Sequence, residues 1–191
     1  MKDRKISRQP GGWNQDVPGL YRCNGMPVTV CDLSEGPSRG TIYVCWSDHR
    51  KGKGNIDIWL SRSTDRGDSW SKPVRVNNDE TRAAQFFPWL AIDQTTGYLY
   101  CVYYDRSDEN SLETRVSLAW STDGGLSFSN VNLSEAPFTP RASVFFGDYN
   151  NISAHNGKIA PIWTQMDKKG KNSVWTAIVT EEKLRNEGIK E

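Results

Sequence analysis

Little in this sequence points to a membrane, a nucleic acid or a leader peptide. No apolar run approaches the length of a membrane span, and the basic start MKDRKISRQPGG has no apolar segment behind it. We therefore expect neither a spanning helix nor a secretory signal. The 24 basic and 23 acidic residues leave a net charge of +1 and are scattered along the chain, which gives no support for nucleic-acid or membrane-surface binding. As written, the chain is expected to be a near-neutral soluble protein of the cytoplasm.

Cysteine and histidine are also scarce. The four cysteines, Cys23, Cys31, Cys45 and Cys101, show no CxxC spacing, and there are only two histidines, so no zinc site is predicted. Cys31, Cys45 and Cys101 lie in alternating apolar runs, where we expect small buried hydrophobic residues; a disulfide between some pair is the alternative. No cofactor is predicted, and calcium binding by loop carboxylates is left open.

Aromatic residues are plentiful, and they belong to a repeat. The chain has 8 Trp, 7 Tyr and 6 Phe, a bias that favours pleated sheets. Two octets, STDRGDSW (63–70) and STDGGLSF (121–128), begin 58 residues apart, and the segments before them also correspond. A third, degenerate copy over residues 148–179 ends without an octet.

Each copy is divided into short β-type segments separated by Gly, Asn, Asp and Ser. Strands are predicted at 27–33, 40–48, 55–63, 71–77, 86–93, 97–105, 114–121 and 130–134. Four antiparallel strands per repeat indicate an all-β protein, a β-propeller with about three blades at 27–78, 86–134 and 146–179, the last incomplete. We expect one domain over 1–191, with tails at 1–12 and 180–191, and only the second tail looks helical.

Each octet falls between the third and fourth strands of its copy, where a hairpin must turn. The aspartate can accept backbone N–H groups, the glycine can take a positive φ, and the aromatic residue can plug the edge of the core. The residues in these positions are Ser63, Asp65, Gly67, Trp70, Ser121, Asp123, Gly125 and Phe128. The octets are therefore interpreted as structural turns.

The octet pattern resembles the Asp box, or bacterial neuraminidase repeat, of sialidase-like glycoside hydrolases, which are often exported. GLYRCNGMPVT, QFFPWLAIDQTTGYLYCVYYDR and FFGDYNNISAHNGKIAPIWT are similar to the C-terminal half of that family, and the resemblance covers about residues 13–179. It implies part of a six-bladed propeller, structural Asp boxes, and retaining hydrolysis of a terminal sialic acid or related acidic sugar.

The loops at the end opposite the octets gather the polar candidates. These are Arg22, Asp48, His49, Arg50, Arg82, Asp105, Arg106, Arg141, Asp148 and Tyr149. The resemblance casts Arg22, Arg106 and Arg141 as clamps for a sugar carboxylate and Tyr149 as the nucleophile. Asp48 completes the catalytic candidates, and Arg50, Asp105 and Asp148 are candidates for substrate binding.

Simpler interpretations stay open. The neighbouring Asp and Arg residues can be exposed loop charges, Tyr149 can be a turn-packing aromatic, and His49 and His155 can be surface residues. The sequence has no recognisable Arg-Ile-Pro motif and only three of six copies, so the chain is expected to be inactive by itself. The alternative function is a non-catalytic carbohydrate- or protein-binding module. A homodimer of half-rings or a separate N-terminal half would complete the propeller.

Overall fold

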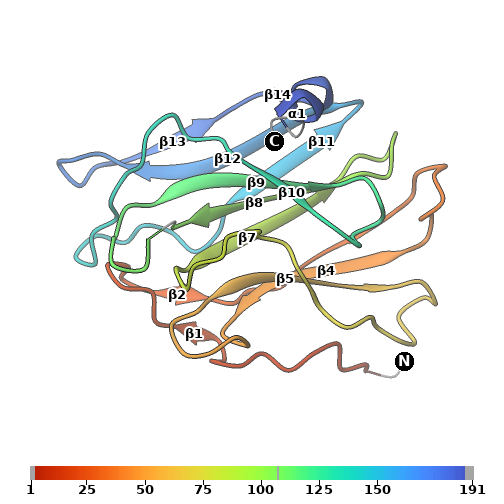
Figure 1. The fold of residues 1–191 in the computed structure, drawn as a ribbon, viewed down its shortest axis with the longest axis horizontal. Coiled ribbons are helices and arrows are strands. Elements are labelled where there is room, and N and C mark those ends of the chain that lie inside the picture. The colour runs from red at the N-terminus through yellow and green to blue at the C-terminus, as the bar shows by residue number, and fades with distance from the viewer. Residues whose placement is uncertain (1–2, 107, 188–191) are drawn as a thin grey trace.

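A computed structural model describes residues 3–106 and 108–187 of the chain as three antiparallel sheets that follow one another in sequence (Figure 1). The first sheet contains β3 (Val28–Cys31), β4 (Ile42–Asp48), β5 (Asp57–Ser63) and β6 (Val74–Arg75). The second contains β7 (Gln85–Ile92), β8 (Leu99–Asp105), β9 (Arg115–Ser121) and β10 (Ser129–Asn132). The strand order in both sheets follows the chain, as in a propeller blade.

The third sheet is built differently at its outer edge. It contains β11 (Asn151–His155), β12 (Lys158–Met166), β13 (Asn172–Thr176) and β14 (Val179–Thr180). Both β13 and β14 pair with β12, so two short strands share one edge. The helix expected near the C-terminus follows as α1 (Glu181–Glu187), and β1 (Asn14–Gln15) pairs with β2 (Cys23–Asn24) as a separate ribbon.

The predicted fold class is confirmed: the chain is all-β, and its four-stranded antiparallel sheets form an open, three-bladed β-propeller. The middle blade is buried on both faces. In β8, Leu99, Cys101 and Tyr103 pack against the first blade. Tyr100 and Tyr104 point the other way and pack with residues of the third blade. This double burial explains why β8 is apolar or aromatic from Leu99 to Tyr104 rather than alternating.

The two octets fold into turns with the same hydrogen bonds. Asp65 Oδ1 accepts the Ser63 hydroxyl at 2.7 Å and the Ser69 backbone N–H at 2.9 Å. Asp123 Oδ1 accepts the Ser121 hydroxyl at 2.7 Å and the Ser127 backbone N–H at 3.1 Å. Gly67 and Gly125 adopt φ of 90° and 77°, a left-handed conformation that favours glycine. Trp70 and Phe128 pack against the cores beside their turns.

These turns are expected to lose stability in acid. Hydrogen bonds from Ser69 and Ser63 lower the pKa of Asp65 from 3.8 to about 2. Burial opposes the same effect at Asp123, but its hydrogen bonds prevail and its pKa is also lowered. Because the folded pKa lies below the unfolded one, this stabilisation is complete above about pH 4 and is lost as the pH falls toward 2.

We expect the double variant Asp65→Asn/Asp123→Asn to have a flatter dependence of the unfolding free energy on pH between about 4 and 2 than the natural chain. Urea unfolding at several pH values measures this slope. The control is Glu135→Gln, on an exposed residue outside both octets. An unchanged slope in the double variant would contradict the assigned hydrogen bonds.

The N-terminal segment covers the outer face of the first blade. Ile6 packs against Val44, Trp46 and Trp59 of β4 and β5. Residues 1–12 were expected to be a tail, yet residues 4–9 line the surface of this blade together with Val44 and Trp46.

One expectation about the cysteines was wrong. Cys45 and Cys101 are buried, with their sulfurs 3.8 Å apart between the first and second blades, and Cys23 is also buried. Cys31 is exposed, because the alternation of β3 turns it outward with Thr29. All four thiols are free in the structure.

Candidate functional site

The loops predicted to share one end of the blades do so. Three different connections, represented by His49, Arg82 and Arg106, line one cavity together with residues of the segment 10–18. The octet turns lie at the opposite ends of the strands, because strand direction alternates within each blade. The polar candidates divide among five places at the loop end.

Asp48 and Arg50 pair with each other against the outer face of the first blade. The fully buried Asp48 carboxylate accepts the Trp46 indole N–H at 2.7 Å, and its Oδ1 accepts Arg50 Nε at 2.9 Å. The Arg50 guanidinium lies 4.6 Å from the centre of the Trp59 ring. The pair therefore holds the β4–β5 loop on the sheet, and neither residue lines the cavity.

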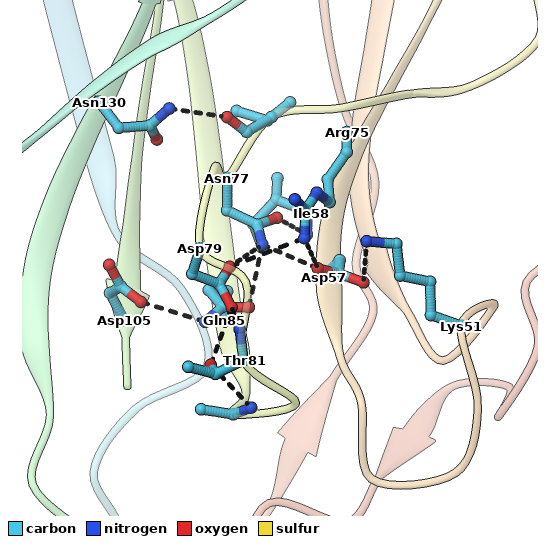
Figure 2. A network of polar contacts seen from close by, with 12 residues as sticks. Lys51, Asp57, Ile58, Arg75, Asn77, Asp79, Thr81, Gln85, Asp105 and Asn130 are labelled. Carbon is cyan, nitrogen blue, oxygen red and sulfur yellow. Dashed lines mark hydrogen bonds and ion pairs between the residues drawn. The ribbon is translucent and has the colours of Figure 1, made fainter. Parts of the chain in front are cut away.

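Asp105 belongs to a polar network between the first two blades (Figure 2). Its carboxylate accepts Gln85 Nε2 at 3.1 Å and the Ser117 hydroxyl at 2.8 Å. Burial raises the pKa of Asp105, and these two hydrogen bonds oppose the rise. The side chain thus faces the interior between the blades rather than a ligand.

Asn77 is the centre of that network. Its Nδ2 lies 2.8 Å from Asp57 Oδ1, 2.5 Å from Asp79 Oδ1 and 3.1 Å from Gln85 Oε1, and its Oδ1 accepts the Ile58 backbone N–H at 2.8 Å (Figure 2). Arg75 Nη1 lies 3.3 Å from Asp57 and balances its buried charge. The network connects β5 and β6 of one blade to β7 and β8 of the next.

Arg22, Asp148 and Tyr149 come together at the segments that lead into β3 and β11. Arg22 donates from Nε to Asp148 Oδ1 at 2.8 Å and from Nη2 to Asp148 Oδ2. Its guanidinium lies 4.9 Å from the ring centre of Phe145, which meets Tyr21 edge-on. These five residues are called the Arg22 cluster.

The aromatic members of the Arg22 cluster are exposed. Tyr149 is 63% exposed and contacts Trp89 on one side of its ring, with the ring centres 5.9 Å apart; Tyr21 and Phe145 are also exposed. The hydrogen bond to Asp148 raises the pKa of Arg22, which keeps it charged. The Nη1 group makes no hydrogen bond within the described part of the chain, so it is available to a ligand.

Arg106 lies in the wall of a cavity that has a volume of about 700 Å³. The cavity is lined by Pro10, Gly11, Asn14, Asp16, Pro18, His49, Lys53, Gly54, Arg82, Ala83, Ala84, Arg106, Asp108, Glu109, Ser111 and Leu112. Arg106 is only 3% exposed, and burial lowers its pKa to about 10. It therefore remains a cation at neutral pH.

The three arginines predicted as carboxylate clamps contact different partners. Arg22 binds Asp148, Arg106 lines the cavity, and the exposed Arg141 donates to the carbonyl oxygen of Lys168. Their joint role as a clamp remains a prediction. His155 lies at the far end of β11, next to the turn into β12, and is exposed.

Sequence reasoning missed several residues of the loop end. Tyr21 and Phe145 join the Arg22 cluster, and residues 10–18 form one wall of the cavity. The glycine and proline residues of the segment 10–18 predict a loop and do not indicate the wall of a cavity. Within residues 3–106 and 108–187, no three His, Cys, Asp or Glu side chains are placed to hold a metal ion, and no helix is long and apolar enough to cross a membrane.

The fold is shared with solved β-propellers. No protein-family model matches the chain, and no curated protein sequence matches it. An α-L-arabinanase from Penicillium chrysogenum, solved with arabinobiose, superimposes with a TM-score of 0.61 at 16% identity over 90% of this chain and 49% of its own.

Two further structures give the same picture. The α-L-arabinofuranosidase Arb93A from Fusarium graminearum, solved with an iminosugar inhibitor, has a TM-score of 0.61 at 15% identity over 91% of this chain and 48% of its own. A protein of unknown function from Dyadobacter fermentans has a TM-score of 0.53 at 16% identity over 93% of this chain and 54% of its own. The chain thus spans about half the length of these structures, and at such identity the likeness defines the fold alone.

Proposed function

We propose that this chain contributes a sugar-binding site to a glycoside hydrolase of the β-propeller type, and that the site is the Arg22 cluster. The observation that carries the proposal is the combination of exposed aromatic rings with a charged arginine that is already oriented by a carboxylate. Aromatic faces provide apolar surface for a sugar ring, and fixed polar groups orient its hydroxyls. The fold shared with arabinan- and arabinoside-cleaving enzymes supports this function.

Each residue has a proposed role. Asp148 holds the Arg22 guanidinium through two N–H groups, and Nη1 donates to the ligand. If the sugar is acidic, as the resemblance to sialidases implies, its carboxylate takes that position. Tyr149 is the proposed nucleophile, because a neutral phenol is not repelled by an anionic substrate. Further blades, from a second copy or a separate half, would close the ring around this site.

The test is a panel of arabinobiose, 4-nitrophenyl α-L-arabinofuranoside and a fluorogenic sialoside, with both binding and hydrolysis measured. We expect Arg22→Ala to weaken binding of the preferred sugar at least about tenfold. In a completed propeller that hydrolyses the sugar, Tyr149→Phe keeps the aromatic ring against Trp89 and is expected to lower kcat by a factor of about 10³ or more while leaving binding intact.

Arg185→Ala is the matched control. Arg185 pairs with Glu181 in α1, and its side chain is 63% exposed against 55% for Arg22, while the two acidic partners are both 19% exposed. The control should bind as the natural chain does. Binding without hydrolysis would favour a non-catalytic sugar-binding module, and equal effects of the two arginine variants would disprove the assigned site.

A further inference from the structure

The third blade differs from the other two at its outer edge. In the first two sheets a fourth strand, β6 or β10, lies beyond the third one. In the third sheet β13 is outermost, because β14 turns back to pair with β12 (Figure 1). Within residues 3–106 and 108–187, β13 therefore pairs along one edge only, and the backbone N–H and C=O groups of its other edge face outward.

This edge lacks the usual protection against pairing with another strand. The edge strand β6 has two residues, follows Pro73 and contains Arg75, and both a proline and a charge discourage a further strand. In contrast, β13 has five residues, NSVWT, which are all exposed and include neither proline nor charge. Val174 is 74% exposed and Trp175 is 49% exposed. An unprotected apolar edge of this length is a template for strand pairing.

The charges around β13 favour an antiparallel partner of the same sequence. Lys168, Lys169 and Lys171 precede the strand, whereas the uncharged residues 177–179 follow it. A parallel copy would place the lysines of both chains side by side, and like charges opposite each other destabilise a sheet. An antiparallel copy places the lysines of each chain beside the uncharged residues of the other.

The side chains of β13 also complement a second copy in size. In an antiparallel pair with its two-fold axis at Val174, the two Val174 side chains face each other, Trp175 faces Ser173 and Thr176 faces Asn172. The large ring thus lies opposite a small side chain, and the two valines form an apolar cross-strand pair. A strand that complements itself in this way fits the two-fold symmetry of a homodimer.

We propose that β13 pairs edge to edge with β13 of a second copy, so that the third sheets of two chains form one continuous sheet. This pairing uses the backbone edge and differs from the face-to-face packing of blades that would close a propeller ring. It does not depend on sugar binding, and it leaves the Arg22 cluster unchanged. The contact is small, so we expect a reversible dimer that forms at micromolar concentrations.

The experiment is sedimentation equilibrium of the full chain from about 1 to 500 µM. The weight-average mass should rise from 21.6 kDa toward twice that value. Val174→Lys and Val174→Glu should each raise the dimer dissociation constant at least about tenfold, because two like charges meet at the axis. An equimolar mixture of the two variants should recover the dissociation constant of the natural chain, because Lys then faces Glu.

Ile162→Lys is the matched control. Ile162 is 44% exposed on the same side of the sheet as Val174, but it lies in β12 and away from the edge, so this variant should dimerise as the natural chain does. Amide hydrogen exchange adds a readout of the backbone. Amides within residues 172–176 should become protected at high concentration in the natural chain and should stay unprotected in Val174→Lys.

A chain that stays monomeric up to about 500 µM would overturn the proposal and would leave the edge to a strand from a different polypeptide. A dimer that survives Val174→Lys, or a mixture that does not recover, would also overturn it. Equal weakening by Ile162→Lys would mean that the blades pack face to face. Val174 is exposed, so its variants should fold. If either does not, concentration-dependent protection of residues 172–176 in the natural chain decides.

Discussion

Tyr104→Phe is expected to destabilise the protein by about 1–3 kcal/mol, whereas Tyr100→Phe, on the same strand, should leave its stability nearly unchanged. The Tyr104 hydroxyl donates to the Thr164 carbonyl at 2.7 Å and accepts the Thr164 N–H at 3.0 Å, which connects the second blade to the third. Without the Tyr104 hydroxyl, the carbonyl and the N–H of Thr164 both lose their hydrogen-bond partner in a buried site. Both tyrosines are fully buried, so the comparison isolates the hydrogen bonds.

The Tyr100 hydroxyl has no hydrogen-bond partner among the described residues, which makes it the matched control. Chemical denaturation of the two variants measures the difference. Tyr104→Ala should cost more, about 3–5 kcal/mol, because it also removes the ring from its contacts with Phe86, Phe138 and Phe146. Similar stability losses for Tyr104→Phe and Tyr100→Phe would mean that the bridge to Thr164 contributes nothing.

Asn77→Leu is expected to cost about 3 kcal/mol or more, because it leaves several buried polar groups without a partner at once. The Ile58 N–H loses its acceptor, and Asp57 and Gln85 lose a donor between the first two blades. The measurement is again the free energy of unfolding. Asn110→Ala, in an exposed loop, is the control and should stay within about 0.5 kcal/mol of the natural chain.

A charge-changing variant adds a second readout at the same position. Asn77→Asp places another carboxyl beside Asp57 and Asp79, so its pKa should be raised in the folded state. A group whose folded pKa is raised costs stability at pH 7 and costs less as the pH falls. Asn77→Asp should therefore recover part of its loss between pH 7 and 5, and Asn77→Leu should not.

Most strands could be predicted from the sequence because their signal is local. Runs of Val, Ile, Tyr and Trp between turn residues predicted 40–48 and 97–105, and the structure has Ile42–Asp48 and Leu99–Asp105. The octets likewise predicted the positions of two hairpins, because the hydrogen bonds that form each turn lie within eight residues. The shared edge of β13 and β14 was not predicted, since residues 172–179 carry no turn signal at the break.

The contacts at the loop end depend on the fold and were predicted only in part. The sequence selected Arg22 and Asp148 as polar loop residues, but 126 positions separate them and nothing local shows that they pair. Asp48 and Arg50 were predicted to belong to a ligand site. Their contacts with Trp46 and Trp59 arise because the β4–β5 loop folds back onto the sheet. The packing of Ile6 on the first blade was missed because one apolar residue in a polar segment gives no periodic pattern.

The outward faces of the first and third blades are covered to different extents. Ile6 and its neighbours cover the outward face of the first blade, whereas on the third blade Ile162 and Val174, which point to the side away from the core, are exposed, Val174 by 74%. Two copies stacked blade to blade would thus present unlike surfaces to each other. Further blades that complete the propeller would have to displace or accommodate residues 4–9 at the first blade, whereas the third blade offers its exposed apolar side chains directly.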